Sequence, residues 1–246
     1  MLEKAINRIL DLAEVQEFIF AGREYTSKGI FPVAEPSPPI LEVNTLRGLV
    51  DYLRSGFDRK EIGVFSMQEQ TASESLRVAL HIVSPELVEV FTPVGGQWKE
   101  RNTIIRASWN RQPFPFGQWL DQEQFVIKMQ AMFLPSKSWQ PVMDVAGRIV
   151  CEDKAELHDD GVTQAVTVSK GVRKESGIIL PNPVTLRPVR TFTEVEQPES
   201  DFVFRIKAEP IVLSLHEADM GAWEMAAKEN IKAYLETELS GVPIFM

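Results

Sequence analysis

The side chains best suited to binding chemistry form a basic and aromatic cluster near the middle of the chain: Arg101, Arg106, Trp109 and Arg111. Arginines bind phosphates and an aromatic ring can stack on a base, so the cluster predicts a surface for single-stranded nucleic acid. Any such binding should depend on Arg106 and Trp109. The alternative is structural. Trp109 shares one side of a predicted strand with Ile105, which favours a buried tryptophan flanked by solvated arginines.

Other residue types suited to catalysis or metal binding lack a matching arrangement. His81 lies on the polar side of an alternating strand, and His216 lies where a strand should pass into a helix. The densest set of potential metal ligands comprises Cys151, Glu152, Asp153, Glu156, His158, Asp159 and Asp160. Their spacing matches neither a zinc site nor a calcium loop, and Asp159-Asp160-Gly161 is typical of a turn.

The chain also lacks a phosphate-binding loop, a dinucleotide fingerprint, a zinc-protease motif and a nucleophile elbow. We therefore predict no catalytic residue, no metal site and no cofactor. An enzyme whose catalytic groups come from distant parts of the sequence remains the alternative, because such a site leaves no local motif.

Alternating apolar and polar residues indicate the strands that would position these groups. In the second half, strands are expected at 162–169, 177–186, 202–207 and 211–215, followed by a helix at 217–239. In the first half, strands are expected at 40–43, 62–67, 76–83, 86–91 and 103–109. A period of two predicts half-buried antiparallel strands. The predicted fold class is α+β, with antiparallel sheet regions in both halves flanked by about five helices.

The expected helices have recognisable ends. Apolar residues at helical spacing predict helices at 2–14 and 138–150. Asn44 or Thr45 should cap a helix that Gly56 ends, and Asp121 with Gln124 should form a capping box for another. A hairpin is expected at 17–25, where Ala21-Gly22 separates two strand-like runs.

Three regions are expected along the chain, although one continuous domain remains open. They are an N-terminal α+β region at 1–116, a two-helix connector at 117–150, and a C-terminal antiparallel sheet with a terminal helix at 151–246. Four prolines make residues 31–39 an extended connector that can join no central strand. A polyproline ligand for a partner is the alternative for this segment.

The segment from Ser240 to Met246 ends in three large apolar side chains, Ile244, Phe245 and Met246. Leaving such side chains exposed forfeits roughly 1.5–3 kcal/mol each, so they should dock on another surface. We predict a homo-oligomer held partly by these residues. Docking on the protein's own core is the alternative.

Composition limits the partners and the compartment. The chain has 35 acidic and 26 basic residues, so weak or no binding to duplex nucleic acid is expected. Its one cysteine, Cys151, excludes an internal disulfide and favours a reducing cytoplasm. No apolar run approaches the roughly 18 residues that cross a membrane, and no signal peptide is expected.

Several stretches resemble a known family in order and spacing. They are Leu41–Leu53, Phe114–Leu120 with Glu123–Phe125, Val166–Val172, Gly177–Pro181 and Phe202–Ile206. Together they resemble the YfdQ-like family of phage and prophage proteins, over most of residues 40–239. The resemblance implies a phage-encoded protein of the bacterial host cytoplasm, often encoded among replication and recombination genes. It implies no activity and no functional residue.

Three classes of function follow, in this order. The first is a non-enzymatic phage accessory protein that self-assembles or binds a phage or host protein or a small ligand. The second is a single-strand nucleic-acid-binding or recombination accessory protein. The third is an enzyme with a cryptic site.

Overall fold

The computed structural model describes residues 17–20, 23–26, 31–32, 39–57, 78–94, 101–148, 155–159, 163–170, 173–174, 178–208 and 210–246. The chain forms two compact units, residues 1–39 and 40–246. In the first unit, β1 (Glu17–Phe20), β2 (Arg23–Thr26) and β3 (Phe31–Pro32) form an antiparallel sheet in that order. The predicted hairpin is confirmed. The predicted helix at 2–14 lies outside the described residues.

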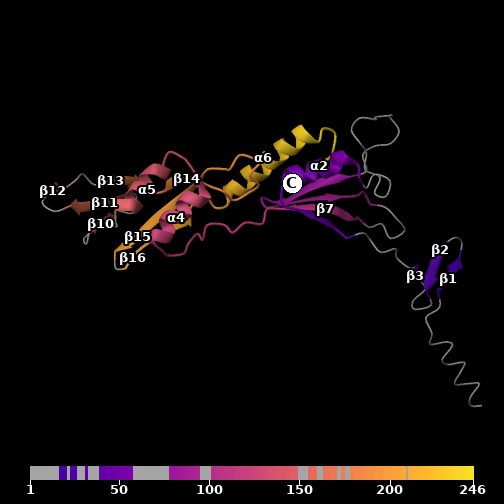
Figure 1. The fold of residues 1–246 in the computed structure, drawn as a ribbon, viewed down its shortest axis with the longest axis horizontal. Coiled ribbons are helices and arrows are strands. Elements are labelled where there is room, and N and C mark those ends of the chain that lie inside the picture. The colour runs from indigo at the N-terminus through magenta and orange to yellow at the C-terminus, as the bar shows by residue number, and fades with distance from the viewer. Residues whose placement is uncertain are drawn as a thin grey trace, which may run out of the picture. The chain divides into compact units, whose positions relative to one another are not determined.

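The second unit contains a five-stranded sheet, here called the first sheet (Figure 1). Its strands, in spatial order, are β17 (Ile244–Phe245), β5 (Ala79–Ser84), β6 (Leu87–Phe91), β7 (Thr103–Ser108) and β4 (Leu41–Val43). The three central strands are antiparallel, as predicted. The strand predicted at 62–67 lies outside the described residues. The two outer pairs are parallel, because β4 and β17 reach the sheet through long connections rather than tight turns.

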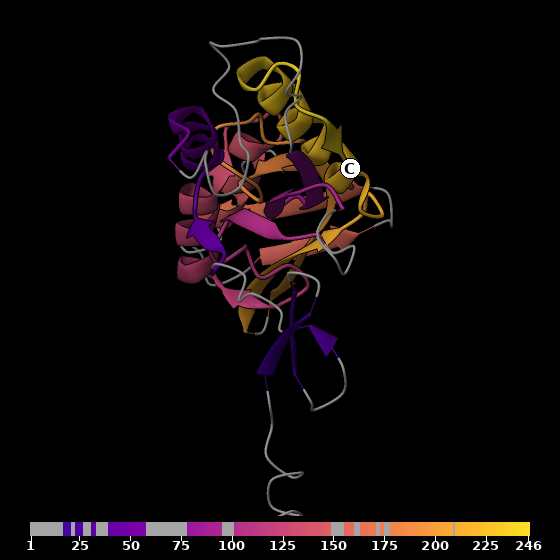
Figure 2. The same ribbon diagram turned by 90° about the vertical axis from the view of Figure 1, so that its right-hand side faces the viewer.

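Helices α2 (Leu46–Ser55) and α6 (Ala222–Glu238) cover one face of the first sheet (Figure 2). Thr45 caps α2 by accepting a hydrogen bond from the Gly48 amide at 3.0 Å, and Gly56 ends the helix at a φ of 61°. Both signals were predicted. The apolar stripe of α2 packs with Ile231, Leu235 and Leu239 of the α6 region. Together with the buried residues of the first sheet they form one hydrophobic core, here called the first core.

We expect Thr45→Ala to lower the free energy of unfolding by about 1 kcal/mol, because the Gly48 amide loses its acceptor. Thr45→Ser is the matched control, since serine keeps a hydroxyl at the same place, and it should stay within about 0.3 kcal/mol of wild type. Urea denaturation measures both. Equal losses in the two variants would show that the cap contributes nothing.

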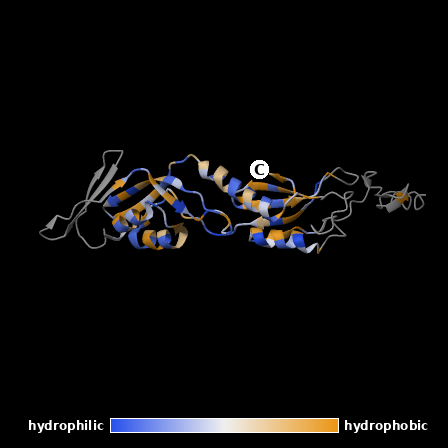
Figure 3. Ribbon diagram, turned by 90° about the horizontal axis from the view of Figure 1, so that it is seen from above, coloured by the Kyte–Doolittle hydropathy of each residue, from blue (hydrophilic) through white to orange (hydrophobic). Residues whose placement is uncertain are grey.

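A second five-stranded sheet follows in the order β8 (Leu120–Asp121), β16 (Ile211–Glu217), β15 (Ser200–Ala208), β14 (Val184–Pro188) and β9 (Phe133–Leu134), all antiparallel. Its core includes residues of α4 (Gln122–Met132) and α5 (Trp139–Arg148). Asp121 caps α4 through the Gln124 amide, as predicted. The two helices expected to connect separate regions therefore pack within this core. Hydrophobic and hydrophilic residues alternate along the strands (Figure 3).

The predicted strand at 177–186 is wrong as a single element. The chain breaks at the cis Asn182–Pro183 bond into β13 (Ile178–Pro181) and β14. β13 pairs with β11 (Thr163–Lys170), which also pairs with β10 (Ala155–Asp159) and β12 (Arg173–Lys174), whereas β14 pairs with β15. The α+β class is confirmed, with four helices in the described part of the chain instead of about five.

Residues 189–199, here called the linking segment, join the two cores. Phe192 and Val195 enter the first core, although the segment connects β14 and β15 of the second sheet. The Thr191 hydroxyl donates a hydrogen bond to the Pro85 carbonyl in the turn between β5 and β6. The buried Gln197 side chain accepts from the Arg190 and Thr191 amides and donates to the Phe192 carbonyl.

Candidate ligand pocket on the first sheet

The outer face of the first sheet, opposite the helices, carries one row of aligned side chains. Strand register places Phe245, His81, Glu89, Arg106 and Glu42 side by side on β17, β5, β6, β7 and β4. Their neighbours along the strands point to the core, so this row points away from it. Five strands thus contribute one residue each to a continuous strip.

An irregularity in β7 adds another residue to this face. Val90 is paired with Ile105, but Phe91 is paired with Thr103, so one extra residue lies in β7 at this point. Such a bulge changes which side chains share a face of the sheet. It places Thr103 beside Phe91 on the outer face while Ile104 and Ile105 remain buried.

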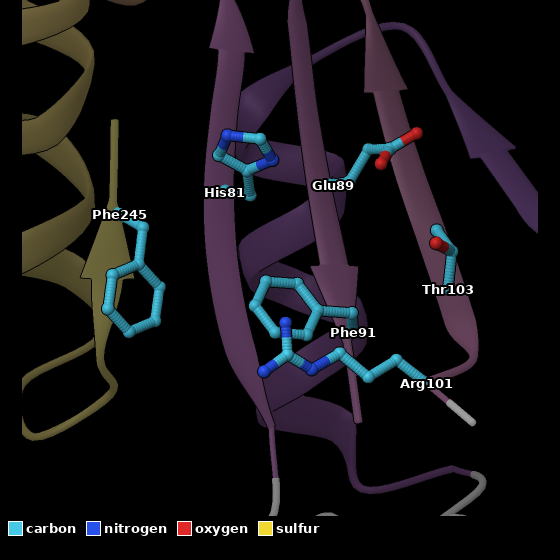
Figure 4. A pocket seen from close by; sticks show the side chains of 6 residues that line it. All are labelled: His81, Glu89, Phe91, Arg101, Thr103 and Phe245. Carbon is cyan, nitrogen blue, oxygen red and sulfur yellow. The ribbon is translucent and has the colours of Figure 1, made fainter. Parts of the chain in front are cut away.

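A pocket of about 440 Å³ lies on this face and is lined by His81, Glu89, Phe91, Arg101, Thr103 and Phe245 (Figure 4). The rings of Phe91 and Phe245 are stacked, with centroids 6.4 Å apart and an interplanar angle of 30°. The Arg101 guanidinium lies 5.5 Å from the centre of the Phe91 ring. Phe245 is 53% exposed, so an aromatic surface is open to a ligand.

The two arginines at the pocket, Arg106 and Arg101, differ in their acidic neighbours. Arg106 Nε donates a hydrogen bond to Glu89 Oε1 at 2.9 Å, and one terminal nitrogen forms an ion pair with the same oxygen at 2.8 Å. The other terminal nitrogen lies 3.7 Å from Glu42. Arg106 is therefore compensated. Arg101 has no carboxylate within ion-pair distance among the described residues.

The segment that follows α6 forms one wall of the pocket. The Leu80 amide donates to the Pro243 carbonyl at 2.9 Å, and Ile244 packs against the first core. This is the docking on the protein's own core that the sequence left open. Phe245 and Met246 remain about half exposed, at 53% and 48%. Self-association through Ile244, Phe245 and Met246 stays a prediction.

The structure separates the four residues predicted to bind nucleic acid. Arg101 lines the pocket and Arg106 lies next to Glu89 on the same face. Trp109 is only 8% exposed and belongs to the first core, with no hydrogen-bond partner for its Nε1 among the described residues. Arg111 is exposed and does not line the pocket. Only Arg101 therefore faces the open aromatic rings.

The histidines and acidic residues form no metal site in the part of the chain that the structure describes. Residues 151–154 and Asp160 of the predicted ligand-rich segment lie outside the described residues. His216 Nε2 lies 3.1 Å from the Ser214 hydroxyl, but Ser214 is fully buried, so no substrate can reach that oxygen in this structure. No described helix is long and apolar enough to cross a membrane.

No family model, curated protein or solved structure matches the chain. The resemblance to YfdQ-like proteins therefore stays a prediction.

Proposed function

We propose that the pocket on the first sheet binds a nucleotide and that the protein is a non-catalytic binding protein. The base lies against Phe91 and Phe245, and Arg101 contacts the phosphate. A phage or prophage origin and a place in the bacterial cytoplasm, both implied by the family resemblance, belong to this proposal.

The half-exposed ring of Phe245, stacked on Phe91, is the observation that carries the proposal. Aromatic side chains on an open sheet face are a recurrent platform for bases, because every base has a flat π-face. Stacking of this kind contributes about 1–3 kcal/mol per base. The pocket volume of about 440 Å³ lies within the usual range for small-molecule sites.

The charge distribution favours a small nucleotide over a long strand. Arg101 is the one pocket cation without a carboxylate partner among the described residues, whereas Arg106 is compensated by Glu89 and Glu42. A strand of several phosphates would need several cations along its path. One arginine matches one phosphate group, and a formal net charge of −9 opposes long polyanions.

We expect AMP or GMP to bind the full chain in isothermal titration calorimetry. Phe245→Ala should weaken binding about tenfold or more through the loss of stacking, and Arg101→Gln should do so through the loss of the phosphate contact. Arg111→Gln, which removes the same charge outside the pocket, is the control and should leave the affinity unchanged.

A short single-stranded oligonucleotide tested in parallel distinguishes a free nucleotide from a nucleotide within a strand. Tighter binding of the oligonucleotide, with the same dependence on Phe245, would assign the pocket to single strands instead. If AMP, GMP and the oligonucleotide all fail to bind at millimolar concentration, the proposal is overturned.

A further inference from the structure

The Glu89 carboxylate lines the pocket, and Arg106 engages one of its two oxygens. Arg106 Nε donates to Oε1 at 2.9 Å, a terminal nitrogen of Arg106 lies 2.8 Å from the same oxygen, and no donor in the described part of the chain contacts Oε2. The side chain is only 21% exposed. A carboxylate oxygen accepts hydrogen bonds and cannot donate them. Oε2 is thus a fixed acceptor at the margin of the pocket.

Strand geometry places Glu89 next to Phe91 on the outward face of β6. Glu89 and Phe91 are two residues apart on β6, which is about 7 Å along a strand, and both face outward. Glu89 is also paired across the strands with His81, which in turn is paired with Phe245. A purine resting on the two phenylalanine rings spans a comparable length, so its base-pairing edge can reach Glu89.

We propose that Glu89 recognises the base and makes the pocket selective for purines that present N–H donors on their base-pairing edge, namely adenine and guanine. This inference rests on the proposed nucleotide-binding function. Arg106 positions the carboxylate by occupying Oε1, and Glu42 holds Arg106 from the other side. A purine without such a donor leaves Oε2 without a partner once water is displaced, which weakens its binding.

The test compares AMP and GMP with purine riboside 5′-monophosphate, which keeps the ring system but has no N–H on that edge. Calorimetry should show that the wild-type protein binds purine riboside 5′-monophosphate about tenfold or more weakly than it binds AMP or GMP, whichever of these two binds more tightly. A loss of this size is expected when a hydrogen bond to a charged group is missing. In Glu89→Ala the three affinities should agree within about twofold.

The ratio of affinities is the readout, because a general loss of structure would weaken all three ligands together. Glu199→Ala is the matched control, since Glu199 is also paired with an arginine, Arg187, on the second sheet, and this variant should keep the wild-type ratio. Equal binding of the three ligands to wild type, lost in Phe245→Ala, would overturn the role of Glu89 and leave the proposed function standing. The absence of any nucleotide binding would overturn the proposed function itself.

Discussion

We expect Phe192→Ala to lower the free energy of unfolding by about 3–5 kcal/mol, the range for truncating a fully buried aromatic side chain. Phe192 is 0% exposed and belongs to the first core, although it is carried by the linking segment between two strands of the second sheet. The truncation leaves a cavity and removes the main apolar contact of this segment. Urea denaturation, followed by circular dichroism, measures the change.

Thr193→Ala is the matched control for Phe192→Ala. Thr193 is the next residue in the linking segment, but its side chain is exposed, so its truncation should change stability by no more than about 0.5 kcal/mol. A loss below about 1 kcal/mol in Phe192→Ala would mean that the first core is stable without the linking segment.

The second large effect is expected at Arg190, a buried cation in the same segment. Its guanidinium stacks 3.9 Å from the Trp223 ring centre and lies 5.6 Å from the ring centres of Phe116 and Phe202. It donates to Glu217 and to the Ser200 hydroxyl. Burial lowers the pKa of Arg190 to about 10, while Glu217 and Asp219 oppose that fall. The group is therefore charged at neutral pH and depends on its acidic neighbours.

We expect Glu217→Gln to lower the free energy of unfolding by about 2–3 kcal/mol, because a buried charge then loses its hydrogen-bonded carboxylate. This value allows for water at Glu217, whose side chain is 43% exposed. The double variant Arg190→Met/Glu217→Gln should be more stable than Glu217→Gln alone, since methionine fills the aromatic cage without a charge.

Thermal and urea denaturation of the two single variants and the double variant give the coupling between the residues. Additive effects of the two substitutions would show that Arg190 and Glu217 do not stabilise each other. A cost of Glu217→Gln below about 0.5 kcal/mol would show that water replaces the carboxylate.

Local signals in the sequence predicted the local structure well. The Thr45 cap, the Gly56 helix end and the Asp121 cap each depend on residues within a few positions of one another. The two-residue strands β8, β9 and β17 were missed, because they exist only through pairing with distant strands. The long strand expected at 177–186 was divided for the same reason: its two halves pair with different partners.

The pocket was less predictable than the fold. Alternation did place His81 on the outer face and Trp109 on the core side of their strands. Glu89, Phe91 and Phe245 meet in one pocket because of the register between strands and the docking of β17. Neither of these leaves a local pattern in the sequence. The bulge that brings Thr103 beside Phe91 is likewise a property of the paired strands. The nearest available signal was the apolar Ile244-Phe245-Met246 run.

The docking of β17 also protects the molecule from uncontrolled association. β17 covers the hydrogen-bonding edge of β5 at Leu80 and His81, an edge that would otherwise be open to strands of other chains. A protease cut near Gly241 would expose this edge and several apolar core residues at once. Proteolytic damage at this point should therefore cause aggregation, in addition to removing the Phe245 wall of the pocket.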